Sequence, residues 1–434
     1  TILIIALVTI MLIFKHHQDA SFIPSDPIVG SIPPTEYFNG LLETTNPKLI
    51  VGFVKGYKYY EGRKFGKAIK EFSQCLKFKP TEEESGALHI LIGNCLYNQN
   101  QYEKAFTWYK KGMEIVERIG DQKGLAAICN NMGKICYIQD KYQEALEWYE
   151  KSSKLYEAVG DQMMLAWTYN EIGDIFYHIQ EQYQEALNWY KKSSKLFEEV
   201  GYKKWLVAIY TKIGNIYSDQ KNYQEALKWY KKCSKLYEEM NDRISLVETF
   251  HKLGDICYYQ SKYSEALEWY EKSGKLYEEM DELKRLAVIY NNIGEIYYAQ
   301  NKYQEALEWY KKSYSLYEEV GDQLGLITIY NDIGKIYFAQ DNYQEALKWF
   351  KKNCELCEEL EHEYALASTY NNIGEIHRAL KNYQSALEWY EKSKEIFERL
   401  DCKRRLAVTL ANIGLLHRDA GNKDLAEQNL TQSY

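Results

Sequence analysis

Apolar residues recur at every third or fourth position along most of this chain, which is the spacing of an α-helix that buries one face. A representative stretch carries two such stripes, the first formed by Leu286, Tyr290, Ile293 and Tyr297 and the second by Tyr303, Ala306, Leu307 and Tyr310. The polar pair Asn301-Lys302 separates the stripes, and "GDQ" at 321–323 offers a helix-ending glycine followed by an N-capping aspartate. The pattern predicts pairs of antiparallel helices joined by short turns.

The same pair of stripes returns with a fixed period, marked by the glycines Gly56, Gly93, Gly133, Gly173, Gly214, Gly254, Gly294, Gly334, Gly374 and Gly414. From Gly93 onward the spacing is 40 residues, apart from one step of 41 between Gly173 and Gly214. We expect the extra residue, within "HIQEQYQEAL", in a turn between helices, where insertions are tolerated best. Stacked helix pairs bury a continuous core, so the sequence predicts an all-α solenoid.

Small and aromatic residues recur at fixed places in each unit. Gly294 and Ala306 stand where two helices come close, and Tyr310 can fill the space beside them. This arrangement resembles the tetratricopeptide repeat (TPR). "GYKYYEGRKFGKAIKEFSQCLKFKP" matches its 34-residue form, and the later units resemble the 40-residue subclass of Pins-type spindle-orientation adaptors and, more distantly, kinesin light chains. The resemblance covers residues 49–434, about ten units with the last incomplete, and implies a right-handed superhelix.

Composition and charge narrow the function. The chain is 46% hydrophobic and 27% charged, which is typical of a protein with a packed core. A net charge of -8 argues against a nucleic-acid binder, because such proteins present basic surfaces to phosphates. Nine cysteines are scattered through helical positions, so we expect small core residues in a reducing compartment. A redox role or a metal site at Cys354 and Cys357 remains an alternative reading.

The sequence contains no phosphate-binding glycine loop, metalloprotease helix or nucleophile elbow. His377 and His417 occupy core-type positions, and we expect them to be packed or to face a partner. The chain is therefore predicted to be no enzyme and to bind no cofactor, metal or small-molecule substrate.

In TPR superhelices the first helices line the inner groove, with the residues three and two before the glycine, one after it and four after it pointing inward. Asparagines gather at these positions, as in the ladders of the spindle adaptors and of O-linked N-acetylglucosamine transferases. The resemblance implies partner-binding residues Asn131, Asn170, Asn291, Asn292, Glu295, Asn331, Asn371, Asn372, Glu375 and Asn412. An amide both donates and accepts, which suits an extended peptide backbone. Glu171, Lys212, Lys252 and Asp332 interrupt the ladder, and a mixed-charge partner is expected. On the alternative reading, the asparagines are solvated or bridge neighbouring repeats.

Eight of the ten tryptophans directly precede the aromatic residue of the second helix, namely Trp108, Trp148, Trp189, Trp229, Trp269, Trp309, Trp349 and Trp389. Adjacent helical residues diverge by about 100°, so Trp309 and Tyr310 cannot face the same neighbour. We expect the tryptophans to pack half-buried between units. An apolar stripe on the convex face is the alternative.

The N-terminal residues differ from the repeats. Residues 1–14, "TILIIALVTIMLIF", are uncharged and apolar except for threonine, and together with a few preceding residues they would reach the length of a transmembrane anchor. Docking on a partner is the alternative. Lys15, His16 and His17 favour a cytoplasmic side for the repeats. Residues 15–48 hold five of the six prolines and predict an extended linker.

Taken together, the sequence predicts a membrane-tethered, non-catalytic scaffold that binds a protein or peptide partner in the concave groove or forms part of a larger assembly. Two alternatives stay open. The repeats could recruit substrates for a catalytic domain outside this chain, or they could sense a peptide whose binding tightens the superhelix.

Overall fold

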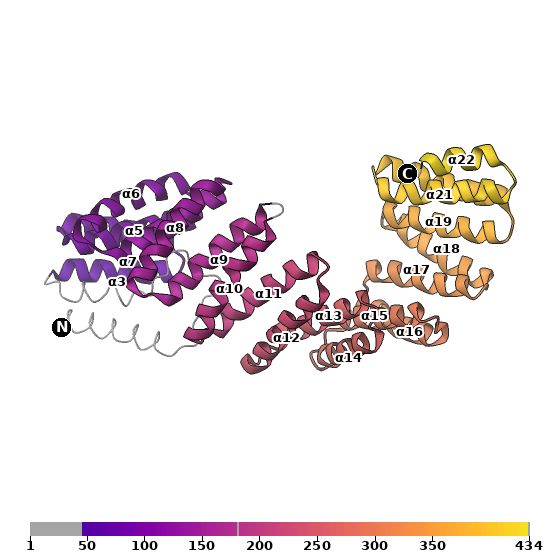
Figure 1. Ribbon diagram of the computed structural model, residues 1–434, viewed down its shortest axis with the longest axis horizontal. Helices are drawn as coiled ribbons and strands as arrows, with labels where there is room; N and C mark the ends of the chain where they lie inside the picture. The colour runs from indigo at the N-terminus through magenta and orange to yellow at the C-terminus, as the bar shows by residue number, and fades with distance from the viewer. Residues whose placement is uncertain (1–45, 180–181, 433–434) are drawn as a thin grey trace. The chain divides into compact units, whose positions relative to one another are not determined.

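The computed structural model describes residues 46–179 and 182–432. Within these ranges the chain forms 20 α-helices and one short 3₁₀ turn, and it contains no strand (Figure 1). The predicted anchor at 1–14 and the predicted linker up to residue 45 lie outside the described residues. The chain divides into two compact units, Thr1–Gln220 and Lys221–Tyr434.

The described part of the first unit contains nine α-helices. They are α3 (Pro47–Glu61), α4 (Phe65–Cys75), α5 (Glu82–Asn98), α6 (Tyr102–Ile119), α7 (Gln122–Ile138), α8 (Tyr142–Val159), α9 (Gln162–His178), α10 (Tyr183–Val200) and α11 (Lys203–Asp219), with the 3₁₀ turn Leu76–Phe78 after α4.

The described part of the second unit contains eleven. They are α12 (Tyr223–Met240), α13 (Arg243–Tyr259), α14 (Tyr263–Glu279), α15 (Leu283–Ala299), α16 (Tyr303–Val320), α17 (Gln323–Ala339), α18 (Tyr343–Glu359), α19 (Glu363–Ala379), α20 (Tyr383–Arg399), α21 (Lys403–Asp419) and α22 (Lys423–Gln432).

Within each unit, helices that follow one another in the chain pack side by side with alternating direction (Figure 1). The odd-numbered helices carry the repeat glycines and are called first helices below, and the even-numbered ones are called second helices. First helices of neighbouring repeats also touch, as α5 does with α7 and α15 with α17. This arrangement confirms the predicted all-α stacking of helix pairs, and the handedness of a superhelix stays a prediction.

The repeat glycines are required by close helix contacts, as the sequence indicated. A Cβ atom on Gly294 would lie 2.4 Å from Cε1 of Tyr310, and one on Gly133 would lie 2.9 Å from the ring of Tyr149. Both tyrosines are almost fully buried, and Ala306 has no exposed surface. Eight of the repeats bury an aromatic ring against a bare backbone in this way, and in the last repeat Leu430 takes the place of the ring against Gly414.

Short turns with one left-handed residue connect the helices. Asn301 has φ 60° between α15 and α16, and Gly321 has φ 68° between α16 and α17. The next residue, Asp322, is the N-cap of α17 as predicted, but its carboxylate binds Nζ of Lys284 at 3.0 Å and caps no backbone N–H. Asp121 does cap α7, since its Oδ1 accepts from the Gly124 N–H at 2.8 Å.

The structure defines two boundaries more closely than the sequence does: the start of the first repeat and the position of the extra residue. Helix α3 begins at Pro47, two residues before the predicted start of the repeats, because Asn46 caps it and a proline in the first turn needs no N–H partner. The extra residue of the 41-residue step lies outside the helices: residues 179–182 join α9 to α10, whereas 139–141 join α7 to α8. Among the described helices, none combines the length and apolarity that crossing a bilayer requires.

Candidate interaction surface

On the first helices from α7 to α19, the side chains three and two positions before the repeat glycine, and one after it, are all polar, and within each unit they form a polar face that Asn94 of α5 and Asn412 of α21 extend. We call this face the polar track. The ten predicted partner-binding residues all belong to it. The structure places Asn131, Asn170, Asn291 and Asn412 in buried positions, and it leaves Asn292, Glu295, Asn331, Asn371, Asn372 and Glu375 partly exposed.

At the start of the track, amides bind one another across repeats. Nδ2 of Asn131 donates to Oδ1 of Asn94 at 3.0 Å, and the hydroxyl of Tyr109 donates to the same oxygen at 2.7 Å. Asn94 has no exposed surface. Asn131 is therefore a bridge between α5 and α7, and Asn94 is a track residue that the sequence reading missed.

The next junction holds an ion pair at the corresponding positions. Nζ of Lys134 lies 3.9 Å from Oε1 of Glu171, whose other oxygen accepts from the hydroxyl of Tyr149 at 3.2 Å. Burial lowers the pKa of Lys134 and raises the pKa of Glu171, while the opposite charges counteract both changes. Desolvation offsets much of the attraction in such a pair, so its main contribution is to fix the partners.

A tighter cluster follows within the first unit. Nζ of Lys212 lies 2.6 Å from Oδ1 of Asp174 and donates to Oδ1 of Asn170 at 2.8 Å. The hydroxyl of Tyr190 donates to Asp174 at 2.5 Å. Glu171 and Lys212, which interrupt the asparagine ladder, thus find complementary partners in the preceding repeat.

In the second unit, a histidine and an asparagine form the corresponding contact between neighbouring first helices. Nδ2 of Asn292 lies 2.9 Å from Nε2 of His251, which stands 3.5 Å from a carboxylate oxygen of Asp255. The hydroxyl of Tyr270 donates to the same carboxylate at 2.6 Å. His251 was not identified as a track residue from the sequence, because the ladder was recognised by its asparagines and this position holds a histidine.

The last three repeats carry the most regular part of the ladder. Asn372 donates to Oδ1 of Asn331 at 2.8 Å, and Asn412 donates to Oδ1 of Asn371 at 3.3 Å. Asn412 also donates to Glu375 at 3.2 Å. Burial raises the pKa of Glu375, and this hydrogen bond opposes the rise.

These contacts follow one rule: the residue two before a glycine binds the residue three before, or one after, the preceding glycine. The sequence separations are 41 or 42 residues in the first case and 37 or 38 in the second. Bridging between repeats, the alternative reading of the asparagines, is therefore what the structure contains for all of the predicted asparagines except Asn291, and partner contact stays a prediction. The spacings 37 and 41 are the signal that could have identified Asn94 and His251.

The second helices carry a different recurring contact. All eight tryptophans before the second-helix aromatic are partly buried, as expected. Trp309 packs on Tyr290 of α15 with ring centroids 5.3 Å apart, and Nζ of Lys312 lies 3.9 Å from the centre of the Trp309 ring. The same lysine, three residues after the tryptophan, covers each of the eight rings. The lysine lies over the tryptophan ring and makes a cation–π contact with it.

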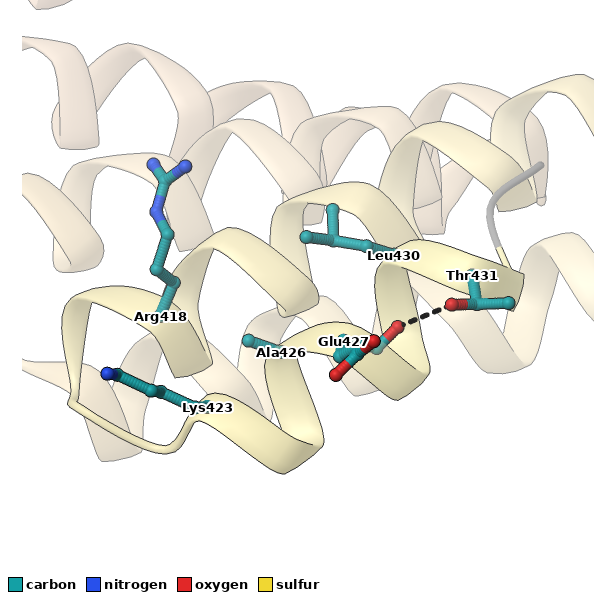
Figure 2. A pocket seen from close by; sticks show the side chains of 6 residues that line it. All are labelled: Arg418, Lys423, Ala426, Glu427, Leu430 and Thr431. Atoms are coloured by element: carbon teal, nitrogen blue, oxygen red, sulfur yellow. Dashed lines mark hydrogen bonds between the residues drawn. The ribbon is translucent and has the colours of Figure 1, made fainter.

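One pocket lies on the α21–α22 pair and has a volume of about 520 Å³. It is lined by Arg418, Lys423, Ala426, Glu427, Leu430 and Thr431. Figure 2 shows the basic Arg418 and Lys423 at one end and Thr431 at the other, where its hydroxyl donates to the Glu427 carbonyl at 2.8 Å. The pocket does not include any predicted site residue.

All nine cysteines are free thiols, and eight are buried. Burial raises the pKa of Cys354 to about 12 and that of Cys357 to about 11, which disfavours the reactive thiolate. In the described part of the chain, no cluster of three or more His, Cys, Asp or Glu side chains has an arrangement that could hold a metal ion. The core interpretation of the cysteines fits this geometry.

Tetratricopeptide repeat models match residues 84–158, 124–199, 205–279, 285–359 and 365–434. The chain belongs to the tetratricopeptide repeat family. No curated protein sequence matches it.

Among the solved structures, this chain is similar at low sequence identity to the following three. A signal transduction ATPase with a tetratricopeptide repeat sensor from Pyrococcus horikoshii is 15% identical, with 81% of this chain and 52% of that chain covered and a TM-score of 0.49. The apo form of RapI is 16% identical over 62% and 96% of the two chains, with a TM-score of 0.48. Kinesin light chain-like repeats from Podosopora anserina are 14% identical over 43% and 92%, with a TM-score of 0.37.

Proposed function

We propose that this chain is a non-catalytic scaffold that binds an extended segment of a partner protein along the polar track. The observation that carries the proposal is the track itself. Its amides and carboxylates stand in a row on successive first helices, and six of the ten predicted residues keep part of their surface exposed. Donors and acceptors at regular intervals suit the main chain and polar side chains of an extended peptide.

The TPR family supports the same conclusion, because stacked helix pairs of this kind present long surfaces for protein binding. The track also constrains the partner. It carries both signs of charge, with Lys134, Lys212 and Lys335 against Asp174, Glu295 and Glu375. A segment with mixed charge complements such a surface better than a uniformly acidic or basic one.

The proposal is tested with a displayed library of random nine-residue peptides, selected on the full chain. Peptides that bind are then measured against the double variant Asn292→Ala with Asn372→Ala. We expect about tenfold weaker binding or more, because two amides of the track are lost. The matched control is Lys311→Ala with Lys351→Ala, since both lysines are exposed on second helices away from the track.

The two asparagines also bridge repeats, so stability must be measured beside binding. Losing two hydrogen bonds should cost about 1–3 kcal/mol in all. Circular dichroism at the temperature of the binding assay should therefore still show a folded protein. Unchanged binding by the folded double variant, or equal loss in the control, contradicts the proposed use of the track.

We further propose that residues 1–14 tether the scaffold to a membrane with the repeats on the cytoplasmic side. The support is the apolar run itself, followed by Lys15, His16 and His17, and the free cysteines of the repeats. Carbonate extraction of cell membranes should leave the chain in the pellet, and protease added to sealed vesicles should digest the repeats if their cytoplasmic face is outward. Release of the intact chain by carbonate rules out the tether.

A further inference from the structure

The junction between α15 and α17 breaks the pairing rule of the polar track. At the other junctions of the second unit, the residue two before the glycine is an asparagine, and it contacts a side chain of the preceding repeat. Here that residue is Asp332, which is buried and, as a carboxylate, has no proton to donate. Its contacts are instead local, with Nζ of Lys335 at 3.0 Å and Nδ2 of Asn331 at 3.3 Å.

The missing donor leaves an oxygen unsatisfied on α15. Asn291 is 93% buried, and its Oδ1 has no hydrogen-bond partner in the described part of the chain. The equivalent oxygens do have partners, because Asn331 accepts from Asn372 and Asn371 accepts from Asn412. By this equivalence, the Asn291 oxygen is expected to face Asp332. A buried acceptor without a donor destabilises the fold, so this arrangement gains from a ligand that donates a hydrogen bond.

A second carboxylate lies one helical turn further along α15. Glu295 makes no hydrogen bond or ion pair with any other described residue, although it is only partly exposed. The negative charges of Asp332 and Asp255 act on it, and Lys335 supplies the opposing positive charge. Three carboxylates against one ammonium group leave the junction with an excess of negative charge.

Tyrosines lie within electrostatic range of these acids. Tyr258 and Tyr298 follow their repeat glycines by four residues, and both are partly exposed. Burial first, and then the nearby carboxylates Glu295 and Asp332, raise the pKa of Tyr258 and of Tyr310. The junction thus combines acceptor oxygens with aromatic rings, which together attract a cation that can donate several hydrogen bonds.

We propose that Asn291, Glu295 and Asp332 form a receptor for the guanidinium group of an arginine in an extended partner segment. The proposal rests on the proposed function and names the side chain that this part of the track selects. Guanidinium offers five donors in a fixed plane, whereas the three residues offer one amide oxygen and two carboxylates. A metal ion fits less well, because the described residues hold no cluster with metal-binding geometry.

The test uses the same displayed peptide library on the full chain. We expect the selected peptides to share an arginine at one position. Synthetic versions of one such peptide, with this arginine or with its neutral isostere citrulline, are then titrated by fluorescence anisotropy. Citrulline should weaken binding to the wild type about tenfold or more. On Asp332→Asn, arginine and citrulline should differ by less than about threefold, because the amide can satisfy Asn291 and removes one charge.

Two measurements keep the outcome clear. Asp332→Asn should fold, since asparagine occupies the equivalent positions 292, 372 and 412, and its melting curve checks this directly. Glu308→Gln is the charge-matched control, because Glu308 is exposed on the second helix α16 and its loss should leave the arginine preference unchanged.

The results of the library selection and of the titrations distinguish the arginine receptor from the more general scaffold proposal. Peptides that bind without a shared arginine, or a citrulline effect that persists on Asp332→Asn, overturn the arginine receptor and leave the scaffold proposal standing. A library that yields no peptide at all overturns both.

Discussion

Replacing Glu295 with glutamine should stabilise the second unit at pH 8 and leave its stability almost unchanged at pH 5. Burial first, and then the charges of Asp332 and Asp255, raise the pKa of this carboxyl from 4.5 to about 7, while Lys335 opposes the rise. Above about pH 7 the wild-type protein therefore holds a carboxylate where the fold favours a carboxylic acid.

The sign follows from proton linkage. The folded state binds the Glu295 proton more tightly than the unfolded state, so this group favours folding most below pH 4.5 and loses that contribution as pH rises to about 7. A rise from 4.5 to about 7 corresponds to about 3–4 kcal/mol at about 1.4 kcal/mol per pH unit. Because the side chain keeps contact with solvent, which screens the charges, we expect about 1–2 kcal/mol.

Glutamine has the shape of the protonated acid and carries no charge, so it should recover this amount at high pH. The measurement is the difference in melting temperature between Glu295→Gln and wild type, followed by circular dichroism from pH 5 to pH 8. A gain of about 1–2 kcal/mol in a unit of this size raises the melting temperature by about 3–6 °C. Glu308→Gln, which removes an exposed charge nearby in the chain, should show no comparable pH-dependent gain. A difference that stays flat across this range, or that grows toward pH 5, refutes the reasoning.

Three further substitutions test other parts of the packing in urea titrations. Gly294→Ala should destabilise by about 2 kcal/mol or more, because the new Cβ would overlap the ring of the second-helix tyrosine, whereas Gly274→Ala meets only ordinary contacts and should gain up to about 1 kcal/mol of helix propensity. Equal effects at both glycines would contradict the close-contact argument. Lys312→Ala should lose about 0.5–1 kcal/mol and Lys311→Ala almost nothing, since only the former covers a tryptophan ring. Lys212→Met should destabilise the first unit by about 1 kcal/mol, allowing for partial exposure, and this loss should shrink in high salt. A salt-independent loss would point to packing of the lysine stem instead.

The fold could be predicted from the sequence because its determinants are local and repeated. The contact between Gly294 and Tyr310 joins residues 16 positions apart, and the turn at Asn301 lies between them. Hydrophobic period, small residues and turn residues all indicate the same helix pair, and ten approximate copies strengthen the signal. The lysine over each tryptophan could also have been found, since a separation of three residues places both side chains on one helical face.

The character of the polar track could be predicted only in part. The residue type at each position indicated a polar face, but its hydrogen bonds depend on which side chains meet across the junction. Asn372 is engaged because Asn331 stands opposite, and Asn291 is left without a partner because position 332 holds an acid. Reading one repeat at a time cannot distinguish these cases. Comparing positions 37 and 41 residues apart does so, because the repeat period fixes which residues face each other.

The difference between asparagines that bridge two repeats and those that do not changes which residues we expect to determine binding specificity. An amide that already bridges two repeats offers a partner only its remaining donor and acceptor, so it contributes less to binding than an amide without a bridge. Asn372 and Asn412 are in this position, and their substitution should affect stability at least as much as binding. The buried oxygen of Asn291 has no hydrogen bond to give up, so it gains one in full, and the Glu295 carboxylate gives up only its contact with water. The binding preference of the track should therefore be strongest at Asn291 and Glu295, which lack a partner in the neighbouring repeat. It should be weaker in the last three repeats, where the asparagines bind one another.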